Sequence, residues 1–186
     1  MKTKLCLLIL LIVGLSVQLS ANPINGLLER IDKGASKKFV IEFKKGADDF
    51  FELDQKGTKV VVRGNNYVNI ATGINWYLKY YAGIQLSWNG MQAKLPQVLP
   101  PVPRKERHET SLSLRYDFNY CTYSYTMAFW DWERWEKEID WMALHGINLP
   151  LAAVGQECIW FNMLQKLGYS KDEINRFIAG PAFLAW

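Results

Sequence analysis

Short runs of hydrophobic residues, separated by glycine, aspartate and lysine, mark the first part of the chain. FVIEF (39–43), FFELD (50–54) and KVVVRG (59–64) are apolar or alternate apolar with polar positions. Runs of this length and pattern are typical of β-strands, and the polar residues between them are typical of turns. The pattern therefore predicts three strands within residues 39–64.

A longer apolar repeat follows Asn65 and Asn66. Its members recur at the 3.6-residue spacing of a helix: Val68, Ile70, Ala71, Ile74, Trp76, Tyr77 and Tyr80. Gly83 is a suitable helix terminator, and IQLSW (84–88) then predicts a fourth strand. We expect a β-β-β-α-β module with one helix packed on a small sheet.

A proline-rich stretch divides the chain near residue 100. LPQVLPPVPRKERHE (95–109) combines four of the seven prolines with a charged run, as linkers do. We therefore expect an N-terminal α/β domain over residues 22–103 and a second domain over 104–186. The charges of Lys37-Lys38 and of Arg104-Lys105-Arg107 are interpreted as solvated loop charge.

The second part of the chain has a different pattern of hydrophobic positions. SLSLRYDF (111–118) alternates as a strand does, and Asp131 is a good N-cap for a helix in which Trp132, Trp135, Ile139 and Met142 form the inward stripe. Gly146 ends that helix, and INLPLAAV (147–154) is nearly all apolar, which predicts a strand buried on both faces.

A second helix is expected after Gly155-Gln156-Glu157. Ile159, Met163, Leu164 and Leu167 form its inward face, and Ser170 with Glu173 forms a capping box for a third short helix that ends at Gly180-Pro181. Strand, helix, buried strand and helix are the order of a parallel α/β sheet. Because two strands cannot close a barrel, we expect the front portion of a longer protein.

The first 21 residues are expected to be a signal peptide. Lys2 and Lys4 precede the apolar run LCLLILLIVGL, and VQLSA offers a cleavage site after Ala21. The run is shorter than the ~20 residues of a membrane span, so we favour cleavage over a retained anchor. The sequence thus predicts an exported protein without stable membrane insertion.

Charge and cysteine content exclude several classes of protein. The net charge is +4 and falls by two when Lys2 and Lys4 are removed, which is too little for a nucleic-acid partner. No metal-ligand spacing is present, and His108 and His145 are the two histidines. Cys121 and Cys158 are predicted to be free, largely buried thiols, although export would permit a disulfide.

Candidate chemistry lies where parallel strands end, because α/β folds bind ligands at that edge. After the first strand, Asn119 offers an amide to a hydroxyl or acetamido group, or else organises its own loop. Cys121 suits a small wall residue better than a nucleophile, because no histidine and base accompany it. Tyr120, Tyr123, Tyr125 and Trp130 have flat faces with polar tips, and Phe129 adds a flat apolar face; such faces suit a sugar ring or equally a dry barrel mouth.

The second strand end carries Gln156 and Glu157. Glu157 is a site carboxylate or, alternatively, only a complement to the helix dipole. A glycosidase needs two carboxylates, about 5–5.5 Å apart for retention and further apart for inversion. Glu133, Glu136, Glu138 and Asp140 are expected on the helix surface, so we identify no catalytic pair in the chain.

A family resemblance extends these interpretations. RYDFNYCTYSYTMAFWDWERWEKEIDWMALHGINLPLAAVGQECIW and LGYSKDEINRFIAGPAFLAW resemble the α-N-acetylglucosaminidase family of exo-acting glycoside hydrolases. NNYVNIATGINWYLKYYAGIQLSW resembles the small α/β domain that precedes their catalytic barrel. Ala153-Val154 departs from the Trp-Ser-like pair that this family leads us to expect there.

The resemblance implies an α/β fold, with the small N-terminal domain followed by the first βα units of a (β/α)₈ barrel. It implies removal of terminal α-linked N-acetylglucosamine from a glycan, with retention and without a metal or other cofactor. The two catalytic glutamates of the family lie downstream of the matched residues. The front wall of the sugar pocket carries over to Asn119, Cys121, Tyr125, Gln156 and Glu157.

Two other functions remain open at this point. One is a non-catalytic carbohydrate-binding or partner-binding fragment. The other is a different barrel glycosidase with the same leading domain, such as an α-glucuronidase-like enzyme. For the α-N-acetylglucosaminidase interpretation, we expect this chain alone to be inactive.

Overall fold

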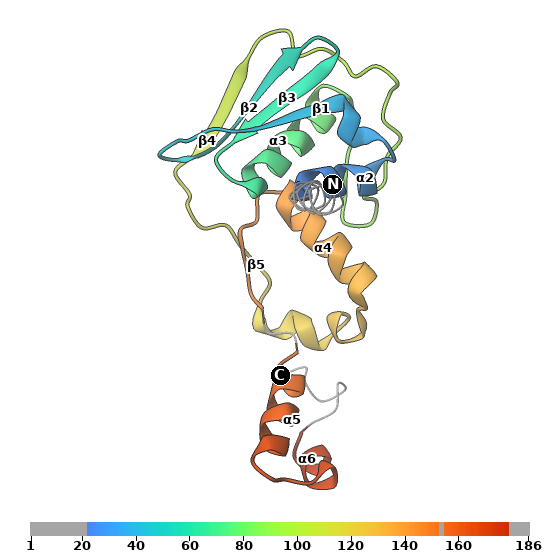
Figure 1. The fold of residues 1–186 in the computed structure, drawn as a ribbon, viewed down its shortest axis with the longest axis vertical. Coiled ribbons are helices and arrows are strands. Elements are labelled where there is room, and N and C mark those ends of the chain that lie inside the picture. The colour runs from blue at the N-terminus through green and yellow to red at the C-terminus, as the bar shows by residue number, and fades with distance from the viewer. Residues whose placement is uncertain (1–21, 153–154, 179–186) are drawn as a thin grey trace, which may run out of the picture.

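The computed structural model describes residues 22–152 and 155–178 of the chain. The predicted signal peptide (1–21) and the Ala153-Val154 departure lie outside these residues. The fold is α/β: a four-stranded sheet with its helices forms one end of the molecule, and a second group of elements extends from it (Figure 1).

The three predicted strands are confirmed. They are β1 (Phe39–Phe43), β2 (Asp49–Lys56) and β3 (Lys59–Gly64). The sheet order is β1-β3-β2-β4, in which β1 pairs with β3 in parallel and the other pairs are antiparallel.

The fourth strand is not the predicted one. Residues 84–88 form no strand beyond an isolated bridge between Ser87 and Gly90. The edge position beside β2 is taken instead by β4 (Glu106–Thr110), which pairs Phe51 with His108 and Glu52 with Arg107. The sheet of the first module therefore includes residues beyond 103.

The predicted helix is α3 (Tyr67–Tyr80), and it covers one face of the sheet. Asn66 caps it by accepting a hydrogen bond from Asn69 N. Ile70, Ile74, Tyr77 and Leu78 are fully buried against sheet residues such as Leu53 and Val62. A Cβ on Gly73 would lie 2.9 Å from Val62 Cγ1, so glycine here allows the helix to approach the sheet closely.

A helix that we did not predict precedes the sheet. It is α2 (Pro23–Ile31), in which Asn22 caps Ile24 N and Pro23 occupies the first turn. Ile24, Leu27, Leu28 and Ile31 are buried in the same core. A 3₁₀ helix, η1 (Ala35–Lys38), connects it to β1.

The proline-rich segment packs on the module, so its interpretation as a linker is wrong. Leu95, Leu99 and Val102 are at most 5% exposed and belong to the core. The Tyr77 hydroxyl donates to Pro100 O at 2.5 Å, and burial raises the pKa of Tyr77 to about 12.

Charged residues of the 104–107 segment are also not simply solvated. Lys105, Arg107 and Lys44 surround Glu52, which is 2% exposed, at N–O distances between 2.6 and 3.2 Å. Burial raises the pKa of Glu52, but hydrogen bonds from the three cations outweigh it and lower the pKa to about 2. The edge strand β4 is thus held partly by charge.

The second group of elements forms a β-α-β unit. Strand β5 (Tyr116–Asp117) is followed by the 3₁₀ helices η2 (Tyr120–Ser124) and η3 (Met127–Phe129), by helix α4 (Trp132–Leu144) and by strand β6 (Leu149–Pro150). β5 and β6 pair in parallel, as predicted. Gly146 has a φ of +80° and follows the end of α4.

Helix α4 buries a different face from the predicted one. Asp131 caps it, as expected, and Glu133 lies in its first turn. Trp132 is 69% and Ile139 46% exposed, whereas Met142 is buried as predicted. Glu138 (2% exposed) and Asp140 (9%) are buried, so their predicted position on the helix surface is wrong. Helix α4 turns this side toward the sheet module.

The last helices are α5 (Gln156–Lys166) and α6 (Lys171–Phe177). The capping box of Ser170 and Glu173 is confirmed. The predicted inward face of α5 is exposed at Ile159, Met163 and Leu167, because no described element covers it. In this part of the chain, Leu149 of β6 is likewise exposed rather than buried on both faces.

Two further expectations concern thiols and the membrane. Cys121 and Cys158 are free, as predicted, but Cys158 is exposed and Cys121 only half-buried. Within residues 22–152 and 155–178, no helix has the length and apolar character needed to cross a membrane.

Candidate functional site

The two predicted wall segments follow the ends of neighbouring parallel strands. Tyr116 pairs with Leu149 and Asp117 with Pro150, and Leu151 N donates to Asp117 O at 3.1 Å. Helix α4 supplies the crossover between the strands. Because both strands run the same way, residues 118–130 and the Gly155-Gln156-Glu157 turn leave the sheet at one edge.

Asn119 organises the loop after β5. Its side-chain oxygen accepts hydrogen bonds from Cys121 N at 3.0 Å and Thr122 N at 3.1 Å, which makes it the N-cap of η2. The residue is exposed, and its amide N–H groups have no partner among the described residues. The oxygen therefore has the loop-organising role, and only the amide donors are available to a ligand.

The other two candidates in this loop are accessible. Tyr125 is 51% exposed, and Cys121 is half-buried beside the turn that Asn119 caps. A half-buried thiol without a histidine partner fits a wall position better than a nucleophile.

Phe118 has a backbone conformation that no sequence pattern predicted. Its φ is +70°, and it is the one non-glycine residue with positive φ in the described ranges. Its N–H donates to Asp117 Oδ1 at 2.8 Å, and its ring meets Tyr123 and Trp135 edge-on at centroid distances of 5.7 and 6.4 Å. A strained backbone therefore sits directly before Asn119.

The Gly155 turn presents Gln156 and Glu157 at the start of α5. Gly155 has a φ of +84° and makes no side-chain cap, so this turn depends on glycine. Gln156 is exposed, and Glu157 is half-buried in the first helical turn. Its position satisfies both of the roles considered for it, a site carboxylate and a charge that complements the helix dipole.

Arg115 joins the β-α-β unit to the sheet module. Its guanidinium contacts Asp49 at 2.9 Å and Asn69 at 3.2 Å, and also donates to the carbonyls of Gly146 and Leu112. Burial raises the pKa of Asp49, but hydrogen bonds from Arg115 and Asn69 leave that pKa below its usual value. The start of β5 is thereby fixed to β2 and α3.

Two buried carboxylates fix α4 to the same module. Glu138 accepts from Trp88 Nε1 at 2.6 Å and from Arg134 Nη2 at 2.8 Å. Asp140 accepts from Arg30 Nε at 2.6 Å and Nη2 at 2.7 Å, and this pairing raises the pKa of Arg30. These contacts position the helix that separates the two strand ends, and sequence periodicity missed them.

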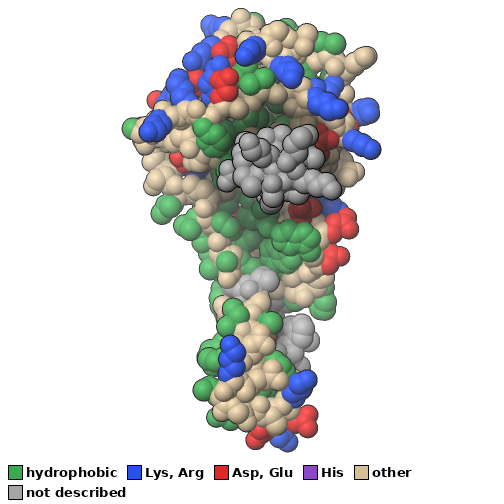
Figure 2. All heavy atoms as spheres, viewed as in Figure 1, with side chains coloured by type: hydrophobic (Ala, Val, Ile, Leu, Met, Phe, Trp, Pro, Cys, Tyr) green, Lys and Arg blue, Asp and Glu red, His purple; other side chains and the backbone are tan. Residues whose placement is uncertain are grey.

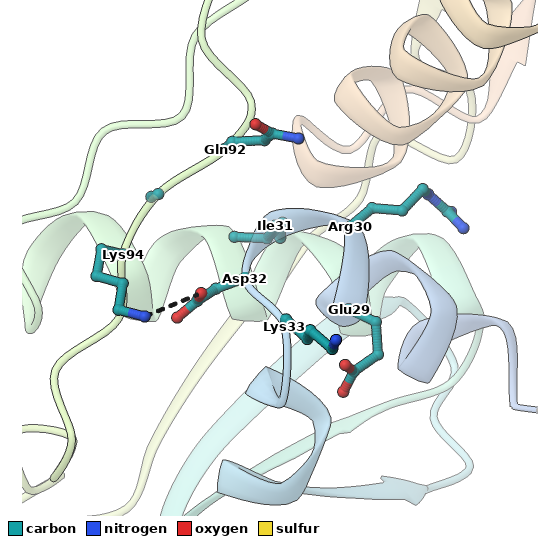
Figure 3. Close-up of a pocket in the computed structure, with 8 residues that line it drawn as sticks. Glu29, Arg30, Ile31, Asp32, Lys33, Gln92 and Lys94 are labelled. Carbon is teal, nitrogen blue, oxygen red and sulfur yellow. Dashed lines mark ion pairs between the residues drawn. The ribbon is translucent and has the colours of Figure 1, made fainter.

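One cavity of the sheet module lies away from the strand ends. It has a volume of about 410 Å³ and lies between the end of α2 and residues 92–94, where Lys94 faces Asp32 while Arg30 points away toward α4 (Figure 3). Its lining mixes acidic, basic and amide groups without a shared chemistry. We assign it no role.

Within the described part of the chain, no group of three or more His, Cys, Asp or Glu residues could hold a metal ion. The carboxylates near the strand ends are Asp117 and Glu157, and Asp117 already accepts from a backbone N–H. The arrangement can bind and orient a polar ring through aromatic faces, amides and a carboxylate.

Comparisons with known proteins agree on one family. The α-N-acetylglucosaminidase N-terminal domain matches residues 22–101, and the TIM-barrel domain of the same family matches residues 115–186. Human α-N-acetylglucosaminidase is 44% identical over 155 residues, which cover 83% of this chain and 21% of that protein.

Solved structures give the same picture. A family 89 glycoside hydrolase from Clostridium perfringens, in complex with 2-acetamido-1,2-dideoxynojirmycin, has a TM-score of 0.82 and 40% identity. The match covers 89% of this chain and 19% of that one. A variant of the same enzyme, in complex with its substrate GlcNAc-α-1,4-galactose, matches equally. The chain thus spans about a fifth of the length of these relatives.

Proposed function

The chain belongs to the α-N-acetylglucosaminidase family, and from that premise we propose that it forms the N-terminal domain and the first βα units of an exported glycoside hydrolase. The enzyme removes terminal α-linked N-acetylglucosamine from glycans, with retention of configuration. The compartment is the periplasm or exterior of a bacterium, or the lysosome of a eukaryote.

One observation carries the proposal. The two segments that resemble the family's sugar pocket follow the carboxyl ends of two hydrogen-bonded parallel strands, where α/β barrels build their sites. The loop after β5 is rich in exposed aromatic side chains, which suit the apolar faces of a sugar ring.

The residues take different parts in this wall. The Asn119 amide and the Gln156 side chain donate to hydroxyl or acetamido oxygens, Glu157 accepts from a hydroxyl, and Tyr125 stacks on the ring. Cys121 is a small wall residue. Phe118 and the α4 carboxylates hold these groups in place without touching the sugar.

This chain by itself supplies no acid and nucleophile pair. Retention needs two carboxylates about 5–5.5 Å apart, one of which forms a glycosyl-enzyme intermediate. We propose that both come from later strands of the barrel, so that the 186 residues contribute binding and positioning alone.

An aryl α-N-acetylglucosaminide assay tests the proposal. The protein expressed from the complete reading frame should release the aryl group, and proton NMR of the first-formed sugar should show the α-anomer. The 186-residue chain should give no turnover above background. Turnover by the chain alone would contradict its predicted inactivity. Release of the β-anomer would contradict retention, and cleavage of an α-glucuronide instead would contradict the proposed substrate.

A further inference from the structure

A second cavity lies where the sheet module meets the start of α4. It has a volume of about 370 Å³ and is lined by Trp88, Asn89, Thr126, Trp130, Arg134 and Lys137. We call it the Trp88–Trp130 pocket. Its residues come from three places: the loop after α3, the loop after β5 and the first two turns of α4.

The aromatic walls of this pocket are held rigidly. Trp88 and Arg134 both donate to Glu138, which is 2% exposed. The Arg134 guanidinium carbon lies 3.9 Å from the centroid of the Trp130 ring and 4.8 Å from that of Trp88. A buried carboxylate, a cation and two indoles thus fix one another before any ligand arrives.

Other lining groups are left available. Among the described residues, the side chains of Asn89 and Thr126 have no hydrogen-bond partner, and Lys137 makes one exposed ion pair with Glu133 at 3.1 Å. No carboxylate lines the described part of the pocket. The lining therefore offers mainly hydrogen-bond donors, which suits a ligand rich in acceptor oxygens.

Docking of α4 explains only part of this arrangement. The contacts of Trp88, Arg134 and Glu138 join the two modules, but Asn89, Thr126 and Lys137 take no part in them. Partly exposed indoles lie beside the amide of Asn89, the hydroxyl of Thr126 and the ammonium of Lys137, whose single ion pair is exposed. This combination has the chemistry of a sugar-binding pocket.

We propose that the Trp88–Trp130 pocket binds a pyranose unit of a glycan, at a position separate from the wall at the strand ends. Tyr125 of that wall and Thr126 of the pocket are consecutive in one loop, so a glycan of several units can reach both. The proposal rests on the proposed function only in that the protein meets glycans.

Fluorine NMR of the protein expressed from its complete reading frame, labelled with 5-fluorotryptophan, tests the proposal. A Trp130→Phe variant assigns the Trp130 signal. The probe is N,N′-diacetylchitobiose, because an α-specific hydrolase leaves its β-linkage intact. The Trp130 signal should shift saturably with added sugar.

Paired variants connect the signal to the pocket. Asn89→Ala with Lys137→Ala should weaken binding about tenfold or more, the effect of losing a hydrogen bond from a charged group. Lys45→Ala, an exposed lysine on the sheet module, should leave the affinity unchanged. Circular dichroism of each variant verifies that it is folded.

The outcomes separate this inference from the proposed function. An unshifted Trp130 signal, or a double variant with unchanged affinity, would contradict sugar binding in the pocket. If the Trp130 signal shifts and the double variant loses affinity while no α-N-acetylglucosaminide is cleaved, sugar binding in the pocket is supported and the hydrolase proposal is contradicted. Turnover of the aryl glycoside by the double variant should equal that of the unmodified protein.

Discussion

Phe118 occupies a backbone conformation that is normal for glycine and costly for other residues. Its positive φ is kept by the hydrogen bond to Asp117 and by ring contacts with Tyr123 and Trp135. Positions of this kind cost about 1–3 kcal/mol and often occur at functional sites. No pattern in the sequence reports φ, which explains why this residue was not predicted.

A pair of substitutions isolates the strain at Phe118. Phe118→Ala and Phe118→Gly remove the same ring, but only glycine also relieves the backbone. We expect Phe118→Gly to be more stable than Phe118→Ala by about 1 kcal/mol, the reverse of the usual order. Urea unfolding followed by tryptophan fluorescence measures the difference. Equal stability, or a more stable alanine variant, would show that the position is not strained.

Glu52 is a buried carboxylate whose ionisation contributes to stability against acid. Its pKa in the folded protein is about 2, below the ordinary value of 4.5 for a glutamate carboxyl. A lowered pKa contributes stability above the unfolded value, and this contribution is lost as the pH falls from about 4.5 toward 2. Allowing for screening by solvent at the half-exposed lysines, the contribution at neutral pH is roughly 1–3 kcal/mol.

Glu52→Gln should therefore lower the free energy of unfolding at pH 7 and flatten its decline between pH 5 and pH 2, as measured in urea. Glu109→Gln is the matched control, since Glu109 is exposed and its one ion pair within the described residues is with Arg107. It should change stability by at most about 0.5 kcal/mol. An equally steep acid transition in Glu52→Gln would assign that transition to other groups.

At the scale of elements, helix α4 depends on its two buried carboxylates. Arg30 binds Asp140 through two hydrogen bonds, and removal of the arginine leaves that carboxylate without its principal partner. Because Arg30 is partly exposed, we expect Arg30→Ala to cost about 1–2 kcal/mol. A double-mutant cycle with Asp140→Asn should give a coupling of about 1 kcal/mol.

The exposed pair of Glu133 and Lys137 on the same helix is the control for that cycle. Its coupling should be about 0.3–0.5 kcal/mol, the value of an ordinary i,i+4 pair. If both cycles gave the same small coupling, the buried pair would not be what holds α4 on the sheet module.

Hydrophobic periodicity predicted most helices and strands well, but it did not predict which strand pairs with β2 at the edge of the sheet. β1 and β3 begin and end where the hydrophobic runs do, and α3 begins after its predicted asparagine cap. The edge strand was missed because ERHET (106–110) has no hydrophobic run, and its pairing depends on Lys105 and Arg107 meeting Glu52. Charged edge strands are favoured because they resist pairing with other chains, and that same charge conceals them in the sequence.

The candidate site was predictable in position more than in detail. The order of strand and helix was enough to place Asn119 and Glu157 after parallel strand ends. The prediction that Trp132 and Ile139 belong to the core was wrong. Helix α4 has two faces, and periodicity does not reveal which of them a neighbouring element covers. The long-range contacts of Arg30 and Trp88 needed the three-dimensional structure.

At the scale of the whole molecule, the start of α2 is compatible with the proposed export. Asn22 caps this helix with its own side chain, so cleavage after Ala21 would leave the cap intact. We expect Edman sequencing of the exported protein to begin at Asn22. A start several residues later would remove the cap and the Pro23 turn, and would contradict the predicted cleavage site.

The two ends of the molecule differ in how much apolar surface they bury. On the face drawn in Figure 2, Lys and Arg lie along the outer rim of the sheet module, while apolar side chains gather below it, around β5 and α4. Helix α5 has no buried residue, and Leu114, Tyr116 and Phe129 are 57–78% exposed. Segments with few buried contacts open locally at low cost, whereas the sheet module has a continuous core.

Chymotrypsin, which cleaves beside aromatic residues and leucine, should therefore attack residues 112–129 of the 186-residue chain first. Mass spectrometry should find a long-lived fragment that contains the whole sheet module, from α2 to β4. In the protein expressed from the complete reading frame, the same bonds should be protected, because the remaining barrel strands would cover the apolar faces of β5, β6 and α5. Equal cleavage rates in both proteins would mean that these faces remain uncovered, and would argue against a closed barrel.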